Sequence, residues 1–184
     1  MQRPGTLVLV VGPSGAGKDT LIAAAKADLA GEPGFVFPRR VVTRAAMATL
    51  EDHDSVTVEE FALREAHGAY ALSWEAHGLR YGLPIGLVDD LDAGRVVVMN
   101  GSRAMSAAAV EKYPGTKIVM IDATPEVRAE RLAGRGRESA EEIAGRLRRE
   151  VSLALPDAIR IDNSGPLAEG VALFVATLRG FGRS

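Results

Sequence analysis

The chain contains no cysteine among its 184 residues, which excludes disulfides, thiol catalysis and zinc sites that depend on cysteine. Its three histidines, His53, His67 and His77, are too scattered for a histidine-rich metal site. No apolar run approaches the roughly 18 residues that a membrane-spanning helix needs, and residues 1–5 lack the layout of a signal peptide. These absences predict a soluble, cytoplasmic protein with no membrane partner.

The chain also has no strong excess of positive or negative charge. The 22 Lys and Arg residues nearly balance 24 Asp and Glu, for a formal net charge of -2, whereas nucleic-acid binding usually goes with a strongly basic patch. Hydrophobic residues make up 47% of the chain, which is too apolar for a disordered segment. We therefore expect one folded domain over residues 1–184, as a monomer or homodimer, that does not bind nucleic acid.

Short apolar runs alternate with helical stretches along the chain. Strands are expected at residues 7–11, 41–43, 70–74, 79–82, 96–99, 118–121 and 158–161, and helices at 18–29, 59–66, 84–92, 104–112, 125–132, 140–154 and 167–178. Continuous apolar strands are typical of a parallel sheet with helices on both faces. The expected fold class is therefore α/β, a doubly wound three-layer fold that binds ligands at the carboxyl ends of its strands.

The strongest chemical signal directly follows the first expected strand and opens the first helix. This stretch is Gly12-Pro13-Ser14-Gly15-Ala16-Gly17-Lys18-Asp19-Thr20. Glycines let the backbone wrap so that successive N–H groups face phosphate oxygens, while the lysine reaches the β- and γ-phosphates. A plain turn needs no such combination, so we expect a P-loop that binds ATP.

One position departs from the usual P-loop. Asp19 stands where Ser or Thr normally ligates Mg²⁺. A carboxylate next to a triphosphate is repulsive unless a cation lies between them, so we expect Asp19 to act on Mg²⁺, directly or through water. Thr20 lies about 100° further round the helix, so it is not a simple replacement.

Arginine far outnumbers lysine, with 18 residues against 4, and seven of these arginines lie within residues 128–149. Three of the seven flank two glycines and are interpreted as a lid over about residues 128–148, because guanidinium groups match phosphate oxygens in pairs. The lid residues are Arg131, Arg135 and Arg137. Others, namely Arg128, Arg148 and Arg149, are expected on a solvated helix surface. A second basic group, Arg39, Arg40 and Arg44, ends a strand where an acceptor phosphate would sit.

Several short motifs, taken in order, resemble those of the guanylate kinases over roughly residues 6–178. They are the P-loop, Thr43-Arg44, Leu72-Ser73-Trp74, His77-Gly78 with Tyr81-Gly82, and Arg131-Leu132-Ala133-Gly134-Arg135-Gly136. The resemblance implies a P-loop NTPase fold with a central parallel sheet, an acceptor-binding insertion at about residues 35–88 and an arginine-rich lid. It also implies that Lys18, Arg131 and Arg135 carry phosphoryl transfer, and that Arg44 and Tyr81 bind the acceptor phosphate.

The departures from that family fall on its base-reading positions. Ser73 stands where guanylate kinases have the Glu that reads the guanine edge, and Asn100 follows a strand where they have Asp. A site that loses such a hydrogen-bonding partner loses much of its discrimination between substrates. The phosphate-binding motifs are therefore kept, while the base reader is not.

These departures are similar to those of a narrower group, the ribose 1,5-bisphosphate phosphokinases of phosphonate utilisation. That resemblance rests on Gly17-Lys18-Asp19-Thr20, Glu51-Asp52-His53, Ala71-Leu72-Ser73-Trp74, His77-Gly78-Leu79 and Asn100-Gly101-Ser102-Arg103. The family transfers the γ-phosphoryl group of ATP to ribose 1,5-bisphosphate, which yields 5-phospho-α-D-ribose 1-diphosphate and ADP. By this resemblance Ser73 and Arg103 belong to the acceptor site, with Arg103 holding the second phosphate.

Two other functions stay open at this point. A nucleoside-monophosphate kinase, above all for GMP, would use the same P-loop, although Ser73 counts against it. A non-catalytic guanylate-kinase-like interaction module typically lacks the P-loop lysine, and Lys18 is present. For either kinase the acceptor phosphate is already an oxyanion with a second pKa of about 6, so no general base is needed.

Overall fold

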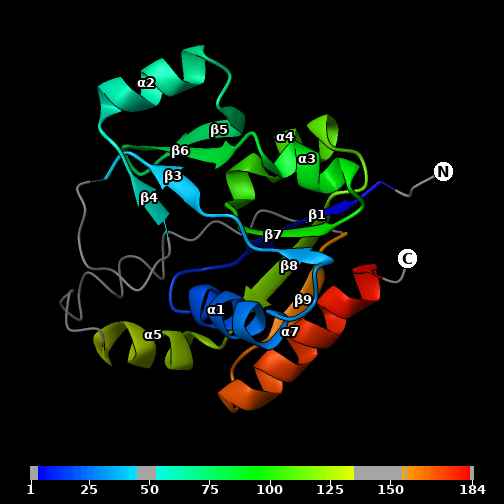
Figure 1. Cartoon of the computed structure of the whole chain (residues 1–184). Helices are drawn as coiled ribbons and strands as arrows, with labels where there is room; N and C mark the ends of the chain where they lie inside the picture. The colour runs from blue at the N-terminus through cyan, green and yellow to red at the C-terminus, as the bar shows by residue number, and fades with distance from the viewer. Residues whose placement is uncertain (1–3, 45–52, 135–154, 156, 183–184) are drawn as a thin grey trace.

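The computed structural model describes residues 4–44, 53–134, 155 and 157–182. Among these residues, parallel strands form a central five-stranded sheet in the order β2-β7-β1-β8-β9 (Figure 1). The strands are β1 (Thr6–Val11), β2 (Phe35–Val36), β7 (Val96–Asn100), β8 (Lys117–Asp122) and β9 (Ile159–Asp162). Because all five run the same way, their carboxyl ends meet at one edge of the sheet, which is where the first loop lies.

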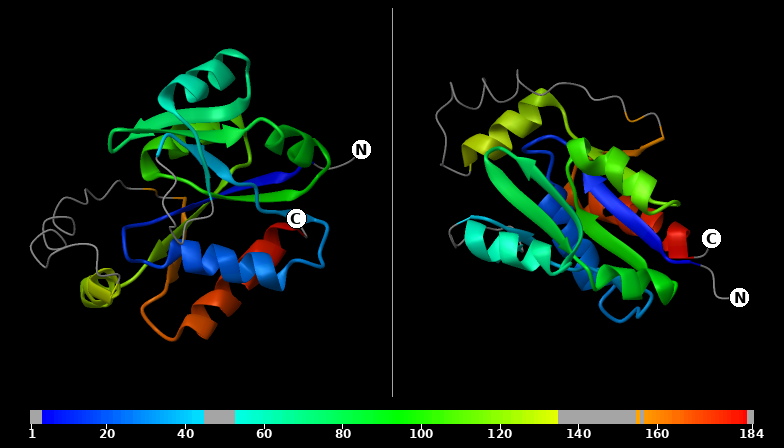
Figure 2. Two further views of the ribbon diagram at one scale, coloured as in Figure 1. Left: turned by 60° about the vertical axis from the view of Figure 1, so that its left-hand side comes forward. Right: turned by 90° about the horizontal axis from the view of Figure 1, so that it is seen from above.

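Two hydrophobic cores lie on opposite faces of this sheet, because successive residues of a strand point to opposite sides. Val8 and Val10 pack into one core, with Leu21 and Phe174 of the helices that cover that face, and Leu9 packs into the other. The helices on the first face are α1 (Lys18–Asp28) and α7 (Leu167–Gly182), and those on the second are α3 (Leu87–Asp92), the 3₁₀ turn η1 (Arg103–Met105) and α4 (Ser106–Lys112) (Figure 2). The result is the expected three-layer arrangement.

A smaller sheet stands beside the main one (Figure 1). Its four strands lie in the order β4-β3-β6-β5, and the helix α2 (Val58–Ala66) packs against it. The strands are β3 (Arg40–Val42), β4 (His53–Ser55), β5 (Tyr70–Ala76) and β6 (Leu79–Pro84). We call residues 40–44 and 53–84 the small subdomain.

The expected α/β fold with a central parallel sheet is confirmed, with a few differences in detail. The helix expected to begin at Pro84 is wrong: Pro84 ends β6, where it pairs with Tyr70, and α3 begins at Leu87. Proline at the end of a strand removes a single ladder N–H, so the strand tolerates it there. Strands β2 and β4 were not expected. The helix predicted over residues 140–154 and most of the predicted lid lie outside the described residues, and none of the described helices is long and apolar enough to cross a membrane.

Candidate active site

The loop between β1 and α1 has the backbone of a phosphate-binding loop. Gly15 and Gly17 adopt φ angles of 81° and 92°, in the left-handed region that side chains disfavour. Space is short as well, because a Cβ on Gly12 would lie 2.0 Å from the carbonyl oxygen of Ile121. The glycines of the motif are therefore required both by conformation and by close packing.

Lys18 folds back over this loop from the first turn of α1. Its Nζ donates hydrogen bonds to the carbonyl oxygens of Gly12 at 2.8 Å and Pro13 at 3.1 Å. Lys18 is half-buried. The ammonium group thus lies across the mouth of the loop, next to the amino end of the helix, where positive potential favours an anion.

Two side chains from other elements contact the outer side of the same loop. Asn163, which follows β9, is 2% exposed, and its Nδ2 donates to the carbonyl oxygen of Ala16 at 2.8 Å. Arg131 of α5 (Pro125–Gly134) donates to the carbonyl oxygens of Ala16 at 3.3 Å and Asn163 at 2.8 Å. Asn163 was not among the predicted site residues, although a polar residue directly after a β-strand in this fold class is a usable signal. Arg135 and Arg137 lie outside the described residues.

Arg128, one turn before Arg131, corrects an expectation. It was expected on a solvated helix surface, yet it is buried, with 8% of its surface exposed. Its Nε donates to the carbonyl oxygen of Ser14 at 3.0 Å. The reason is that α5 packs directly against the P-loop: a Cβ on Gly15 would lie 2.8 Å from the carbonyl oxygen of Arg128.

Asp19 lies at the start of α1 and contacts the end of β7. The Nδ2 of Asn100 donates to its Oδ1 at 2.5 Å, which leaves Oδ2 for a metal or a water molecule. Thr20 is exposed. No group of three or more acidic or histidine side chains that could hold a metal occurs among the described residues. A single carboxylate still fits Mg²⁺, which usually takes one or two carboxylates together with substrate phosphates and water.

A cavity of about 140 Å³ opens beside Asp19, between α1, the end of β7 and the segment Phe37-Pro38 that leads into the small subdomain. Polar and cationic side chains share its lining with apolar ones; the polar and cationic members are Asp19, Lys26, Arg40 and Asn100. The guanidinium carbon of Arg40 also lies 5.3 Å from the ring centre of Tyr81. Tyr81 in turn stacks on Trp74 with a centroid distance of 5.2 Å.

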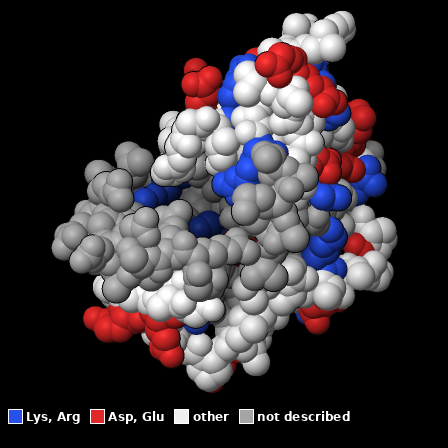
Figure 3. Space-filling view, turned by 90° about the vertical axis from the view of Figure 1, so that its left-hand side faces the viewer, with Lys and Arg blue, Asp and Glu red and all other residues white. Residues whose placement is uncertain are grey.

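The predicted acceptor residues come from different elements of the structure. Arg40 and Tyr81 are neighbours, and Arg44 follows β3 in a half-buried position. Arg103 is half-buried at the start of η1, just beyond the carboxyl end of β7. On the face shown in Figure 3, Lys and Arg atoms lie in and around a hollow between the small subdomain and the rest of the molecule.

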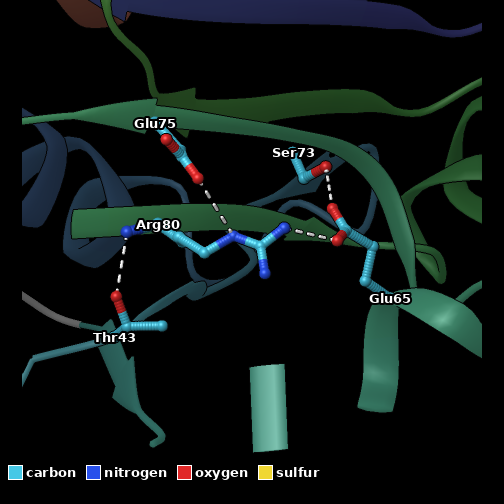
Figure 4. Close-up of polar contacts among 5 residues, drawn as sticks. All are labelled: Thr43, Glu65, Ser73, Glu75 and Arg80. Atoms are coloured by element: carbon cyan, nitrogen blue, oxygen red, sulfur yellow. Dashed lines mark hydrogen bonds and ion pairs between the residues drawn. The ribbon is translucent and has the colours of Figure 1, made fainter. Parts of the chain in front are cut away.

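Ser73 lies within a polar network of the small subdomain (Figure 4). Its hydroxyl donates to Oε1 of Glu65 at 2.5 Å, and Arg80 contacts the other carboxylate oxygen of Glu65 and also Glu75. The hydrogen bond from Ser73 and the charge of Arg80 lower the pKa of Glu65 below its usual value. Cross-strand pairing puts Tyr81 opposite Trp74, one residue on from Ser73, so Tyr81 and Ser73 point to opposite faces of the sheet. Contact of Ser73 with an acceptor stays a prediction.

Comparison with known proteins identifies close relatives of this sequence, although no family model matches it. It is 48% identical over 173 residues to a ribose 1,5-bisphosphate phosphokinase of Brucella melitensis, which covers 93% of this chain and 90% of that protein. It is 49% identical over 181 residues to a ribose 1,5-bisphosphate phosphokinase of Burkholderia mallei, with 97% of each chain covered. An alignment over 97% of the chain includes the P-loop, the small subdomain and α5 together.

Comparison with solved structures supports the fold. A guanylate kinase from Anaplasma phagocytophilum superposes with a TM-score of 0.72 and covers 100% of this chain and 89% of its own. The sequence identity is 19%, so this likeness shows the shared fold alone.

Proposed function

The chain belongs to the ribose 1,5-bisphosphate phosphokinases, and we propose that it transfers the γ-phosphoryl group of ATP to the 1-phosphate of ribose 1,5-bisphosphate. The products are 5-phospho-α-D-ribose 1-diphosphate and ADP. In the transfer a phosphate oxygen of the acceptor forms a bond to the γ-phosphorus, and the bond between that phosphorus and the β–γ bridging oxygen breaks. One observation carries the proposal above all: a chain with an intact phosphate-binding loop is 49% identical, over 97% of its length, to a ribose 1,5-bisphosphate phosphokinase.

The nucleotide is proposed to bind at the P-loop. Backbone N–H groups of residues 12–20 would surround its phosphates, and Lys18 would turn from the loop carbonyls to the β- and γ-oxygens. Asp19 would hold Mg²⁺ through Oδ2, and the ion would neutralise charge on the β- and γ-phosphates. Asn100 fixes the direction of the Asp19 carboxylate from the acceptor side.

The acceptor is proposed to lie between Asp19 and the small subdomain. Arg44 and Tyr81 would hold the reacting phosphate, and Arg103 the second phosphate, which a nucleoside monophosphate lacks. Arg40 adds a further cation at the cavity beside Asp19. The chain needs to supply mainly positive charge, because two polyanions must approach in line and the acceptor oxygen is already ionised.

Arg131 and Arg135 are proposed to stabilise the transferring phosphoryl group. The described bonds of Arg131 run from Nη1 to the carbonyl oxygen of Ala16 in the P-loop and from Nη2 to that of Asn163. A guanidinium has five N–H donors in one plane, so a residue held in this way still has donors for phosphate oxygens. Its attachment to the loop keeps the cation close to the nucleotide site.

The test is an ADP-release assay with ribose 1,5-bisphosphate, GMP and AMP side by side. We expect kcat/KM for the sugar to exceed that for GMP by about 10⁴ or more, because GMP has one phosphate and would leave the polar groups proposed to bind the second phosphate unpaired. The variant Arg103→Ala should raise the KM of the bisphosphate, while the exposed Arg160→Ala serves as a control for loss of an arginine.

Other outcomes of the same assay decide the alternatives. A rate for GMP equal to or above that for the sugar would return the protein to the nucleoside-monophosphate kinases. No ADP release with any acceptor, together with no binding of ATP, would make it a non-catalytic module.

A further inference from the structure

Arg128 has no part in the proposed reaction, yet it is one of the most unusual side chains in the described structure. Arginine is rarely buried unless it is paired or hydrogen-bonded, and Arg128 is only 8% exposed. Its Nε donates to the carbonyl oxygen of Ser14, within the phosphate-binding loop. The contact joins α5 to the phosphate-binding loop, so its effect is expected on the conformation of that loop.

The geometry of one peptide bond shows what the contact controls. The carbonyl of Ser14 and the N–H of Gly15 belong to the same planar peptide and point in opposite directions. A donor that holds this carbonyl on the outer side of the loop therefore turns the Gly15 N–H toward the inner side. Inward N–H groups are what a phosphate-binding loop offers to its ligand.

The packing of α5 against the loop places Arg128 next to the peptide between Ser14 and Gly15. The backbone of Arg128 approaches so closely that a Cβ on Gly15 would lie 2.8 Å from its carbonyl oxygen. Gly15 has a φ of 81° and no side chain, so it makes no side-chain contacts that could fix the conformation of the loop. The next carbonyl, that of Ala16, has a different holder, because Asn163 and Arg131 both donate to it. The bond to Ser14 is thus a separate contribution of Arg128.

We propose that Arg128 is a positioning residue of the phosphate-binding loop. It acts on a nucleoside di- or triphosphate through the peptide between Ser14 and Gly15 and does not contact the ligand. The inference rests on the nucleotide-binding part of the proposed function and is independent of which acceptor is used. A loop already in its binding conformation loses less conformational freedom when the ligand binds, so its affinity is higher.

Two substitutions separate the donated hydrogen bond from charge and from packing. In Arg128→Gln the amide nitrogen Nε2 stands as many bonds from the backbone as Nε of arginine, so a donor is kept without the charge. In Arg128→Met a methyl carbon takes that place, so packing is kept without a donor. The matched control is Arg179→Met, because Arg179 pairs with Glu32 and Asp28 between α1 and α7, away from the loop.

The measurement is the Kd of ADP by isothermal titration calorimetry without acceptor, together with Tm and the steady-state constants. We expect Arg128→Met to raise the Kd of ADP and the KM of ATP by roughly 10- to 100-fold, the range for loss of a hydrogen bond from a charged donor. Arg128→Gln should stay within about threefold of the unsubstituted protein, and the KM of the acceptor should change in neither variant. Arg179→Met should lower Tm without changing the Kd of ADP.

Three results would overturn the proposal. Normal ADP affinity in Arg128→Met would make the contact purely structural. Equal losses in Arg128→Gln and Arg128→Met would mean that charge matters and the donated bond does not. If Arg128→Met does not fold, the Gln variant decides alone, and a loss of tenfold or more in its ADP affinity counts against the proposal. A wrong acceptor assignment would leave the ADP titrations unchanged, whereas failure of the unsubstituted protein to bind ADP would reject the P-loop role itself.

Discussion

Cationic side chains contact different kinds of oxygen in the two parts of the molecule. Around the P-loop the described bonds run to backbone carbonyl oxygens; the donors are Lys18, Arg128 and Arg131. In the small subdomain the described ion pairs run to carboxylates, since Arg80 contacts Glu65 and Glu75, and Arg64 contacts Glu60. The same residue type therefore has two structural uses within one chain.

The difference follows from the charge of the partner. A carbonyl oxygen is neutral, so a bond to it orients a cation without cancelling its charge, and the charge still acts on a nearby polyphosphate. A carboxylate cancels the charge, so an ion pair such as that of Arg80 with Glu65 holds α2 to the β5–β6 hairpin and contributes little to anion binding. The largest effects on catalysis should thus come from the P-loop side.

The first prediction concerns Lys18, where the comparison predicts the largest effect. Lys18→Ala should reduce kcat by about 10²–10³ or more, because the lysine stabilises charge on the transferring group. The Tm should change little, since the side chain is half-buried and outside both cores. Lys117→Ala, an exposed lysine at the start of β8, is the control for removing a positive charge. A folded Lys18→Ala protein with normal turnover would reject the P-loop assignment.

How far the sequence predicts this structure depends on the distance between the contacting residues. Strands such as β1 and β7 and the P-loop were predicted because their signals are local, either a run of apolar residues or one motif. The contact of Arg128 with Ser14 joins residues 114 apart, and that of Asn163 with Ala16 joins residues 147 apart. No local pattern marks such pairs, so Arg128 was expected in solvent and Asn163 was missed.

Short elements were missed for a related reason. Strand β2 has two residues and β4 has three, too few for a period of two to be recognised. Both form because long-range partners are in place: β2 pairs with β7, and β4 pairs with β3 across the intervening residues 43–52.

The second prediction tests whether the P-loop needs its tight packing. In Gly17→Ala the new Cβ would lie 2.5 Å from Nδ2 of Asn163, and φ at this position is 92°. We expect a loss of about 1–3 kcal/mol in the free energy of unfolding, from backbone strain and displacement of Asn163, and weaker ADP binding. Chemical denaturation and calorimetry measure both effects. Gly31→Ala, where nothing lies within 4 Å of the new carbon, should change neither, and equal behaviour of the two variants would contradict this picture.

The smallest expected effect is in the small subdomain, where the cations are paired. The pKa of Glu65 is lowered by Ser73 and Arg80, so its carboxylate stabilises the fold while ionised, an effect present above its ordinary pKa of 4.5 and lost as pH falls through the lowered value. Glu65→Gln should therefore reduce the free energy of unfolding by less than about 1 kcal/mol at pH 7, because the pair is partly exposed, and by less near pH 3.

Denaturation of Glu65→Gln and Ser73→Ala at the two pH values also tests the role of Ser73. If its hydroxyl serves only Glu65, Ser73→Ala should lose part of the pH-dependent stability that Glu65→Gln loses, because Arg80 still lowers the pKa of Glu65. Both variants should keep the KM of the acceptor, because Ser73 and Tyr81 lie on opposite faces of the sheet. Should Ser73→Ala alone raise the KM of the bisphosphate, the serine contacts the acceptor. The small subdomain would then use this residue for recognition as well as for holding α2 in place.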